Sequence, residues 1–202
     1  MDMTYFLKLG YKTANPAHND FIIKDFQRHC GIKADGIIGS ITQSKMRIYD
    51  KNNYCPEVFE PIKPYIPYTN EQIESLCEKG LVGLGTAFNY CSYLYDFDVL
   101  HNLAHAILES NWGTSYIARV KNNLYGWRAY DTSPVESAVA TEGKATCISL
   151  WSEWFNKEYL EPDGRYFRGN NEYCVNIVYA SSSIAGINKS FLVQQLRKKL
   201  NG

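Results

Sequence analysis

Residues 99–113, VLHNLAHAILESNWG, carry the clearest structural pattern in this chain. Apolar side chains recur in it at positions i, i+3, i+4, i+7 and i+8, the spacing of a buried helical stripe. They are Leu100, Leu103, Ala104, Ile107 and Leu108. His101, His105 and Glu109 are four residues apart and follow one flank of this stripe. The pattern predicts a buried helix that ends at 111–113 and carries an acid in its last turn.

Glu109 is close in sequence to many aromatic residues. They are Trp112, Tyr116, Tyr125, Trp127 and Tyr130. A carboxyl group that is partly desolvated against aromatic rings keeps its proton to higher pH, because burial disfavours the charged form. A glycosidase general acid needs this property. An exposed glutamate in the last turn of a helix is the alternative interpretation.

Glu109 also begins a longer pattern. Glu-Ser-Asn-Trp-Gly-Thr-Ser at 109–115 is followed by Asn-Asn-Leu-Tyr-Gly-Trp at 122–127, and Gly164-Arg165-Tyr166 and Asn176-x-x-Tyr179 come later. Together these segments resemble the catalytic core of bacterial and phage glucosaminidases of glycoside hydrolase family 73, which cleave peptidoglycan. The resemblance covers about residues 98–190 and implies a mainly α fold, with an α+β lysozyme-like catalytic domain.

The resemblance also implies roles for individual residues. Glu109 matches the general acid of the family, and Tyr179 matches a tyrosine that lines the cleavage site. The expected substrate-binding residues are Trp112, Asn123, Tyr125, Trp127, Tyr130, Tyr166 and Asn176. Aromatic faces stack on sugar rings, and amides and hydroxyls bind N-acetyl and hydroxyl groups. Tyr125 and Trp127 could equally belong to the core, because aromatic residues dominate cores as well as sites.

The second catalytic carboxylate is where the sequence departs from the family pattern. Many members carry this group on a long β-hairpin, but only residues 131–141 fill the corresponding gap here. Asp131, Glu136 and Glu142 are the candidates, and Glu136 also fits a helix capping box that begins at Ser133. If none of them is well placed, the 2-acetamido group of the substrate can attack C1 instead.

A second resemblance lies near the N-terminus. Phe26-Gln27, Gly31, Asp35-Gly36-Ile37, Gly39 and Thr42 are similar to the signature of a three-helix peptidoglycan-binding module. The sequence predicts a helix around 21–29, a tight Asp-Gly turn and a helix that opens near Ser40. The resemblance implies cell-wall binding through Phe26, Gln27, Asp35 and Gly36. The same residues could instead serve only to build a helical hairpin.

Prolines divide the chain. Pro56, Pro61, Pro64 and Pro67 fall within a short stretch, which favours an extended, semi-rigid spacer. We therefore expect a peptidoglycan-binding module at 1–50, a Pro-rich linker at 51–68 and the catalytic domain at 69–202.

The composition of the chain limits the classes of binding partner that we expect. The chain has 202 residues with 21 basic and 21 acidic side chains, so no net field attracts nucleic acid or an anionic membrane. No apolar run reaches the length of a membrane span, and the first residues do not look like a secretory signal.

The six cysteines are expected to be reduced thiols. The basic amphipathic segment 191–200 is expected to pack on the domain, with contact to a membrane or wall as the alternative.

Metal and cofactor chemistry is not expected. His101 and His105 have a spacing that could bind a metal, but Asn102 stands where zinc proteases carry their glutamate. Local packing or hydrogen bonding is the favoured role for both histidines.

The predicted function is hydrolysis of peptidoglycan glycan strands, as an endo-β-N-acetylglucosaminidase that cleaves GlcNAc-β-1,4-MurNAc bonds with Glu109 as general acid. A muramidase, a lytic transglycosylase and a non-catalytic wall-binding protein remain alternatives. We expect a monomeric phage endolysin or an autolysin. As an endolysin it would be made in the host cytoplasm without a signal peptide and released to the wall through a holin, and a virion-associated enzyme is the other possibility.

Overall fold

The computed structural model describes residues 3–8, 11, 19–48, 60–127, 134–179 and 185–202, and these are mostly helical. The mainly α fold class is therefore confirmed. Within the described residues, the pairing of extended segments is limited to one antiparallel bridge between Pro61 and Asn171. The expected β part of the catalytic domain is otherwise absent from these residues.

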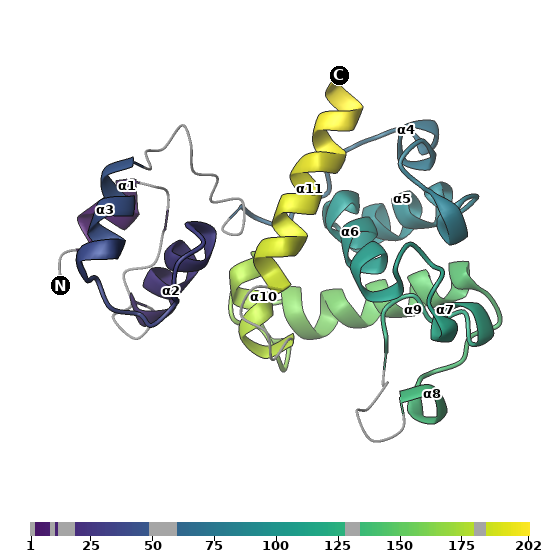
Figure 1. Cartoon of the computed structure of the whole chain (residues 1–202). Helices are drawn as coiled ribbons and strands as arrows, with labels where there is room; N and C mark the ends of the chain where they lie inside the picture. Colours follow the sequence, from purple (N-terminus) through teal and green to yellow (C-terminus); the bar gives the residue numbers. More distant parts are fainter. Residues whose placement is uncertain (1–2, 9–10, 12–18, 49–59, 128–133, 180–184) are drawn as a thin grey trace.

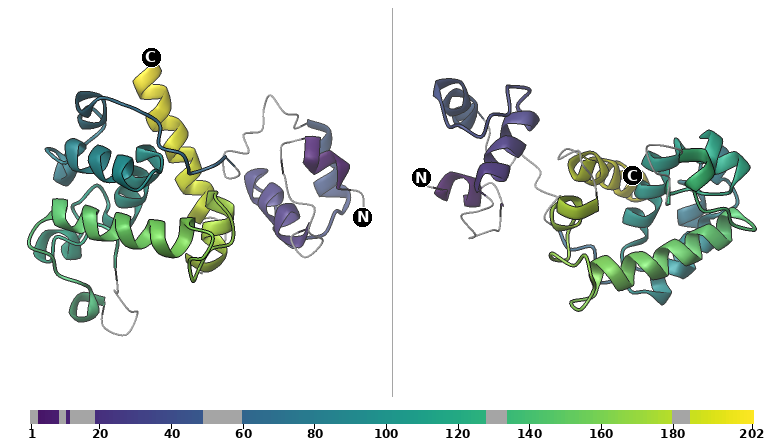
Figure 2. Two further views of the ribbon diagram at one scale, coloured as in Figure 1. Left: turned by 180° about the vertical axis from the view of Figure 1, so that it is seen from behind. Right: turned by 90° about the horizontal axis from the view of Figure 1, so that it is seen from below.

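The helices form two groups, which Figures 1 and 2 show at opposite sides of the molecule. The smaller group consists of α1 (Thr4–Lys8), α2 (Asn19–His29) and α3 (Ser40–Ile48). The larger group consists of α4 (Asn70–Glu74), η3 (Lys79–Leu81), α5 (Gly85–Leu94), α6 (Val99–Ser110), α7 (Tyr116–Val120), α8 (Pro134–Ser137), α9 (Lys144–Phe155), the π-helix η4 (Asn156–Leu160), α10 (Glu172–Tyr179) and α11 (Ala185–Asn201).

Helix α6 is the predicted buried helix and lies at the centre of the larger group. It packs against α5 and α11, and its start is capped by Asp98, whose side chain accepts the Leu100 N–H. The polar residues His101, Asn102 and His105 are buried along with the apolar stripe. Leu108 differs from the prediction, because 47% of its surface is exposed at the end of the stripe. Leu108 and Glu109 therefore lie on the exposed side of the helix, while Ser110 after them is buried.

The chain turns sharply after α6. Asn111, Trp112 and Gly113 all have positive φ angles, of 49°, 61° and 70°, and Gly113 tolerates this conformation best because it lacks a Cβ atom. A Cβ atom at Gly113 would also meet the Gly80 backbone at 2.9 Å. Lys144 secures the contact by donating to the carbonyls of Gly80 and Gly113, at 2.7 and 3.1 Å. The predicted end of the helix is thus confirmed, and packing against Gly80 explains why residue 113 is a glycine.

Part of the predicted linker belongs to the larger group. Ile62 is fully buried in its core, and the Ile62 carbonyl accepts the Asp98 N–H that precedes α6. Lys63 donates to Glu161 at 2.6 Å, and the Lys63–Pro64 peptide bond is cis. Residues 60–68 therefore differ from a free spacer, because Ile62 gains more from burial than from solvent exposure. The remainder of the predicted linker lies outside the described residues.

The smaller group has its own buried cluster. Phe6, Tyr11, Ile22, Ile23, Phe26 and Cys30 form it, together with Tyr173 of α10. The Phe21 ring meets the Tyr173 ring edge-on at a centroid distance of 4.3 Å. Helix α10 therefore contributes to both groups. The predicted division at residue 50 stays a prediction.

Five of the six cysteines are described, and all five are free thiols, four of them buried. Burial raises the pKa of Cys77 to about 12, which makes its thiolate scarce. Cys55 lies outside the described residues. None of the described helices combines the length and apolar character that a membrane crossing requires.

Candidate active site

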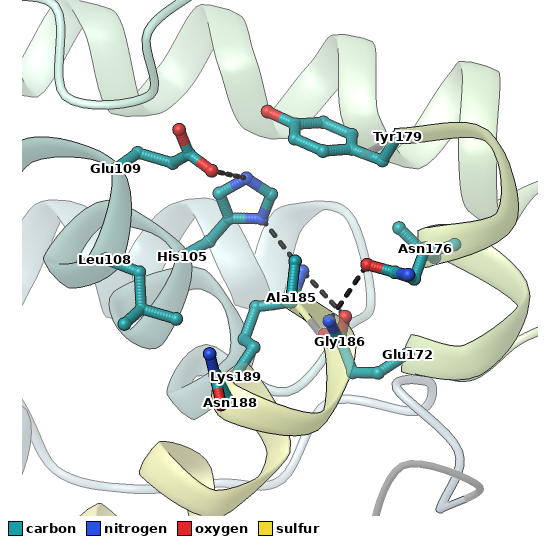
Figure 3. Close-up of a pocket in the computed structure, with 11 residues that line it drawn as sticks. His105, Leu108, Glu109, Glu172, Asn176, Tyr179, Ala185, Gly186, Asn188 and Lys189 are labelled. Atoms are coloured by element: carbon teal, nitrogen blue, oxygen red, sulfur yellow. Dashed lines mark hydrogen bonds and ion pairs between the residues drawn. The ribbon is translucent and has the colours of Figure 1, made fainter. Parts of the chain in front are cut away.

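A cavity of about 160 Å³ opens where α6, α10 and α11 meet (Figure 3). Its walls include His105 and Glu109 from α6, Asn176 and Tyr179 from α10, and Lys189 from α11. The cavity is thus lined by residues that are far apart in the chain, and Glu109, the predicted general acid, is one of them.

Glu109 lies at the mouth of this cavity, where 42% of its side chain is exposed. The backbone at Gly126 passes close to it, since a Cβ atom there would stand 3.6 Å from Glu109 Oε2. Partial burial raises the pKa of Glu109 above its usual value, and the positive charge of Lys189 opposes the rise. A carboxyl group with these properties retains a proton at higher pH than an ordinary glutamate and can deliver it to a bound molecule.

His105 lies directly beneath Glu109, one helical turn earlier. Its Nε2 atom is 3.8 Å from Glu109 Oε1 and has no hydrogen-bond partner. Its ring is enclosed by aromatic rings, with Tyr179 at 4.6 Å and Trp151 at 4.7 Å between centroids. Burial lowers the pKa of His105 well below its usual value, and the positive charge of Lys189 adds to the effect. His105 is therefore neutral at neutral pH.

A buried ion pair lies on the other side of His105. Lys189 Nζ is 2.7 Å from Glu172 Oε2 and 2.9 Å from His105 Nδ1. Glu172 Oε1 is 2.7 Å from His101 Nδ1. Burial alone would raise the pKa of Glu172, but the charges of Lys189 and His101 and the hydrogen bonds they make outweigh it and lower the pKa. Glu172 is therefore ionised, and each of its two carboxylate oxygens has a partner. The sequence patterns singled out neither Glu172 nor Lys189.

An aromatic groove of about 640 Å³ lies beside the cavity. Trp127, Trp154, Tyr159 and Tyr166 line it, together with Glu158 and Arg165. Tyr179 joins the two hollows, because its ring is 5.5 Å from that of Tyr159 and it also lines the cavity. Burial strongly raises the pKa of Tyr179, and the nearby charge of Glu109 adds to this, so its hydroxyl stays protonated. Flat apolar faces and a few polar groups suit a sugar chain.

Four of the predicted substrate and catalytic residues surround these two hollows in addition to Glu109. Asn176 and Tyr179 line the cavity, and Trp127 and Tyr166 line the groove. The side-chain oxygen of Asn176 also accepts the Gly186 N–H at 2.9 Å, which ties α10 to the start of α11.

Two other predicted substrate-binding residues are structural. Only 2% of Tyr125 is exposed, its ring stacks on Trp151 at 4.0 Å, and its hydroxyl donates to Asn102. Asn123 is buried and binds the backbone of Trp127 and Val139. The core alternative therefore applies to Tyr125, because a buried ring cannot stack on a sugar. Asn123 instead holds the loop that presents Trp127.

Of the remaining predicted residues, those that the structure describes line neither hollow. Trp112 packs partly buried against the core, and its carbonyl accepts the Gly80 N–H. Glu136 and Glu142 are exposed. Tyr130 and Asp131 lie outside the described residues. Glu109 and Glu172 are the acids that line the cavity in the described part of the chain, and the second is already paired.

The metal-binding alternative for the two histidines gains no support. Both Nδ1 atoms have partners, Glu172 for His101 and Lys189 for His105. No cluster of three or more histidine, cysteine, aspartate or glutamate residues within the described ranges could hold a metal ion.

The predicted wall-binding residues build a turn in the smaller group. Phe26 is fully buried, and Gln27 donates to Asp35, to Thr42 and to the Ile37 carbonyl while it accepts the Gly36 N–H. Phe26 therefore has no surface to offer a ligand, which corrects its expected role. A hollow of about 390 Å³ lies over this turn. Ile37 and Ile41, 65% and 67% exposed, form part of it.

Comparisons with known proteins agree with this arrangement. Residues 86–195 match the glucosaminidase family, described as mannosyl-glycoprotein endo-beta-N-acetylglucosaminidase. Proteins from two strains of Streptococcus pneumoniae, which carry the provisional name endo-beta-N-acetylglucosaminidase, are 31% identical over 153 residues. These cover 76% of this chain but 22% and 20% of the relatives, so the chain spans about a fifth of their length.

Among solved structures, autolysin E of Staphylococcus aureus has a similar fold. One crystal structure matches with a TM-score of 0.60 and 18% identity over 94% of each chain. Another, of a catalytic mutant in complex with the disaccharide NAG-NAM, matches with a TM-score of 0.60 and 19% identity over 72% of this chain and 73% of the other.

Proposed function

The chain belongs to the glucosaminidase family, and we propose that it is a glycosidase that cleaves the glycan strands of bacterial peptidoglycan. The bond we assign is GlcNAc-β-1,4-MurNAc, which makes the enzyme an endo-β-N-acetylglucosaminidase. The provisional names of the Streptococcus pneumoniae relatives support this activity. The NAG-NAM disaccharide bound to autolysin E supports the substrate.

One observation carries the proposal most directly. Glu109 is a carboxyl group with a raised pKa at the mouth of a cavity, and an aromatic groove adjoins that cavity through Tyr179. The groove can hold a run of sugar rings, and the acid in the adjoining cavity can protonate a glycosidic oxygen.

In the proposed reaction, Glu109 gives its proton to the glycosidic oxygen while the bond from that oxygen to C1 breaks. The positive charge at C1 is then met by water or by the 2-acetamido oxygen of the same sugar, and water finally adds to C1. Asp131 or Glu136 would assist this second half. Because Glu172 is buried in an ion pair, we assign it no part in attack at C1.

Replacement of the proposed acid tests this assignment. Glu109→Gln should lower the rate of clearing of a purified cell-wall suspension by about 100-fold or more, since general acids contribute a factor of about 10²–10⁴. Glu153→Gln is the matched control, because it neutralises an exposed carboxyl group on α9 that lines neither hollow and should keep full activity. Substantial activity in Glu109→Gln would contradict the assignment.

Mass spectrometry of the digested wall identifies the bond. Reducing-end N-acetylglucosamine is the expected product. Reducing-end N-acetylmuramic acid would identify a muramidase, and a 1,6-anhydro end would identify a lytic transglycosylase. Unchanged wall, together with retained binding, would favour a non-catalytic wall-binding protein.

The hollow in the smaller group is the proposed wall-binding site. Exposed Ile37 and Ile41 beside the polar turn around Asp35 suit a ligand with apolar and amide groups. Ile41→Ser should reduce sedimentation of the chain with purified walls while leaving cleavage of soluble glycan fragments unchanged. Equal sedimentation of the variant and the unaltered chain would argue against this site.

The proposed setting is lysis of a bacterium by a phage endolysin that is made in the host cytoplasm and reaches the wall through a holin. Expression of the chain in a susceptible host, with and without a holin, tests this setting. Lysis that requires the holin is expected. Lysis without it would favour an autolysin or another route to the wall.

A further inference from the structure

Four buried side chains extend inward from Glu109. His101 and His105 come from α6, Glu172 from α10 and Lys189 from α11, and Figure 3 shows three of them beside the cavity. The contacts run from His101 to Glu172 at 2.7 Å, from Glu172 to Lys189 at 2.7 Å and from Lys189 to His105 at 2.9 Å. Burying an ion pair costs free energy, so the presence of this pair next to the proposed general acid Glu109 points to a functional role.

The contact between Lys189 and His105 fixes the position of a proton. Paired with Glu172 at 2.7 Å, Lys189 is an ammonium group, which donates hydrogen bonds and cannot accept them. Nδ1 of His105 must therefore accept. In a neutral imidazole, the proton must then reside on Nε2.

The Nε2–H group faces Glu109. It is 3.8 Å from Glu109 Oε1, it is buried, and it has no hydrogen-bond partner. The surrounding rings of Trp151 and Tyr179 prevent the imidazole from turning away. A small movement of the exposed Glu109 side chain would satisfy this donor, and catalytic hydrogen bonds are often long before substrate binds.

We propose that Lys189 and Glu172 are positioning residues that hold His105 as its Nε2–H tautomer, so that His105 donates a hydrogen bond to the Glu109 carboxylate formed when the proton leaves. The inference rests on the proposed role of Glu109 as general acid. Only the Glu109 proton is transferred, to the glycosidic oxygen, and the proton on Nε2 stays in place. Stabilisation that develops as charge develops lowers the barrier to the reaction.

Glu172 has a separate part in this arrangement. An unbalanced Lys189 ammonium near the general acid would favour the ionised carboxylate before the reaction. Glu172 offsets that charge, and His101 occupies its other oxygen. The groups that face Glu109 are His105 on the same helix, Lys189 on α11 and Tyr179 on α10. Among these described groups, Lys189 carries the only formal charge.

The simpler alternative is that the Lys189–Glu172 pair only joins α10 to α11. The two roles differ in a double variant. Lys189→Met/Glu172→Gln removes both charges and keeps similar side-chain volumes, so it restores packing without restoring the donor to His105 Nδ1. A purely structural pair would then leave activity intact.

Nitrogen NMR of the histidine rings is the direct test. In the chain labelled with ¹⁵N-histidine, His105 should appear as the neutral Nε2–H tautomer at pH 7, with its signal assigned by loss in His105→Gln. In the double variant, the two tautomers should exchange. A wild-type spectrum with the proton on Nδ1, or with both nitrogens protonated, would overturn the proposal. This readout requires no activity, so it separates failure of this inference from failure of the proposed function.

Kinetics provide the second readout. In the double variant kcat should fall by about 10-fold or more at an unchanged KM, because one preorganised donor to a developing negative charge contributes a factor of about 10²–10³ and the variant weakens that donor. The alkaline limb of the pH–rate profile should also move to higher pH, because the ionised form of Glu109 loses the stabilisation of a fixed Nε2–H donor. Lys199→Met is the control, since Lys199 is on the same helix as Lys189 but its ion pair with Glu78 is exposed. Wild-type kcat and pH profile in the double variant would overturn the proposal.

Discussion

Asp25 and Glu172 are both buried, with 3% and 1% of their surfaces exposed, yet their surroundings differ sharply. Asp25 lies in the smaller group, where the Tyr11 hydroxyl donates to it at 2.5 Å. Burial raises its pKa to about 7, although Arg28 partly opposes the rise. Glu172 has Lys189 and His101 at 2.7 Å, and its pKa is lowered. Burial penalises both charges, and only the partners around Glu172 overcome the penalty.

The difference leads to opposite dependences of stability on pH. Because the pKa of folded Glu172 is lowered, its contribution is present above its usual value of 4.5 and is lost as the pH falls. Because the pKa of folded Asp25 is raised, its contribution to the stability of the smaller group is most favourable below its usual value of 3.8 and is lost as the pH rises towards 7. At neutral pH, Glu172 therefore stabilises the larger group, whereas ionisation of buried Asp25 lowers the stability of the smaller group.

The largest effect is expected when one charge of the buried pair is removed. Glu172→Gln alone leaves Lys189 buried without its counter-charge and should lower the free energy of unfolding of the larger group by about 3–5 kcal/mol. Urea unfolding followed by tryptophan fluorescence measures this, because Trp112, Trp127, Trp151 and Trp154 all follow residue 68. Glu142→Gln should have almost no effect. A loss below about 1 kcal/mol for Glu172→Gln would contradict the importance of the pair.

A smaller effect of opposite sign is expected for Asp25. Asp25→Asn should raise the stability of the smaller group at pH 8 by about 2–4 kcal/mol, since a shift of one pKa unit corresponds to about 1.4 kcal/mol. The gain should disappear at pH 3.5. Circular dichroism at 222 nm detects the loss of α2 and α3, and tryptophan fluorescence should stay constant through that transition. Equal stabilisation at both pH values would show that the Asp25 charge is not the cause.

The contact between the two groups should contribute less. Phe21→Ala removes the ring that meets Tyr173, and we expect a loss of about 1–2 kcal/mol from the smaller group, because the ring is only partly buried. The tryptophan transition should move little. If both transitions moved equally, the two groups would unfold as one unit, and the contrast between them would be weaker than we infer.

The smallest effect is expected for an exposed ion pair of the same length. Lys24 and Asp20 on α2 are also 2.7 Å apart, but their side chains are 34% and 63% exposed. Lys24→Ala should change stability by less than about 0.5 kcal/mol, because water screens the pair. Thermal unfolding in low and high salt measures it. A loss as large as that of Glu172→Gln would mean that burial is not what distinguishes the two pairs.

Local patterns in the sequence were sufficient to predict several parts of the fold. The helix at 99–110 and its end at 111–113 follow from apolar spacing and from Gly113, which act within a few residues. The helix that opens near Ser40 is present in the structure for the same reason. The position of Glu109 at the end of a buried helix could therefore be predicted, along with its raised pKa.

Other expectations could not be decided locally. Tyr125 and Trp127 are two residues apart and similar in chemistry, yet Tyr125 stacks in the core and Trp127 lines the groove. Ile62 lies in a Pro-rich stretch that favours a spacer, yet it is fully buried. In both cases the outcome depends on which distant segment covers the side chain, and that information is not in the neighbouring residues.

Local sequence patterns were thus enough to predict the helix that carries Glu109, the turn that follows it and the family to which the pattern belongs. The groups that surround this acid come from distant segments and could be identified only in the folded chain. Glu172 and Lys189 are separated from their histidine partners by 71 and 84 residues. Helical spacing relates residues three or four positions apart, whereas charge, burial and tautomer depend on distances in space, which are set when α10 and α11 pack against α6.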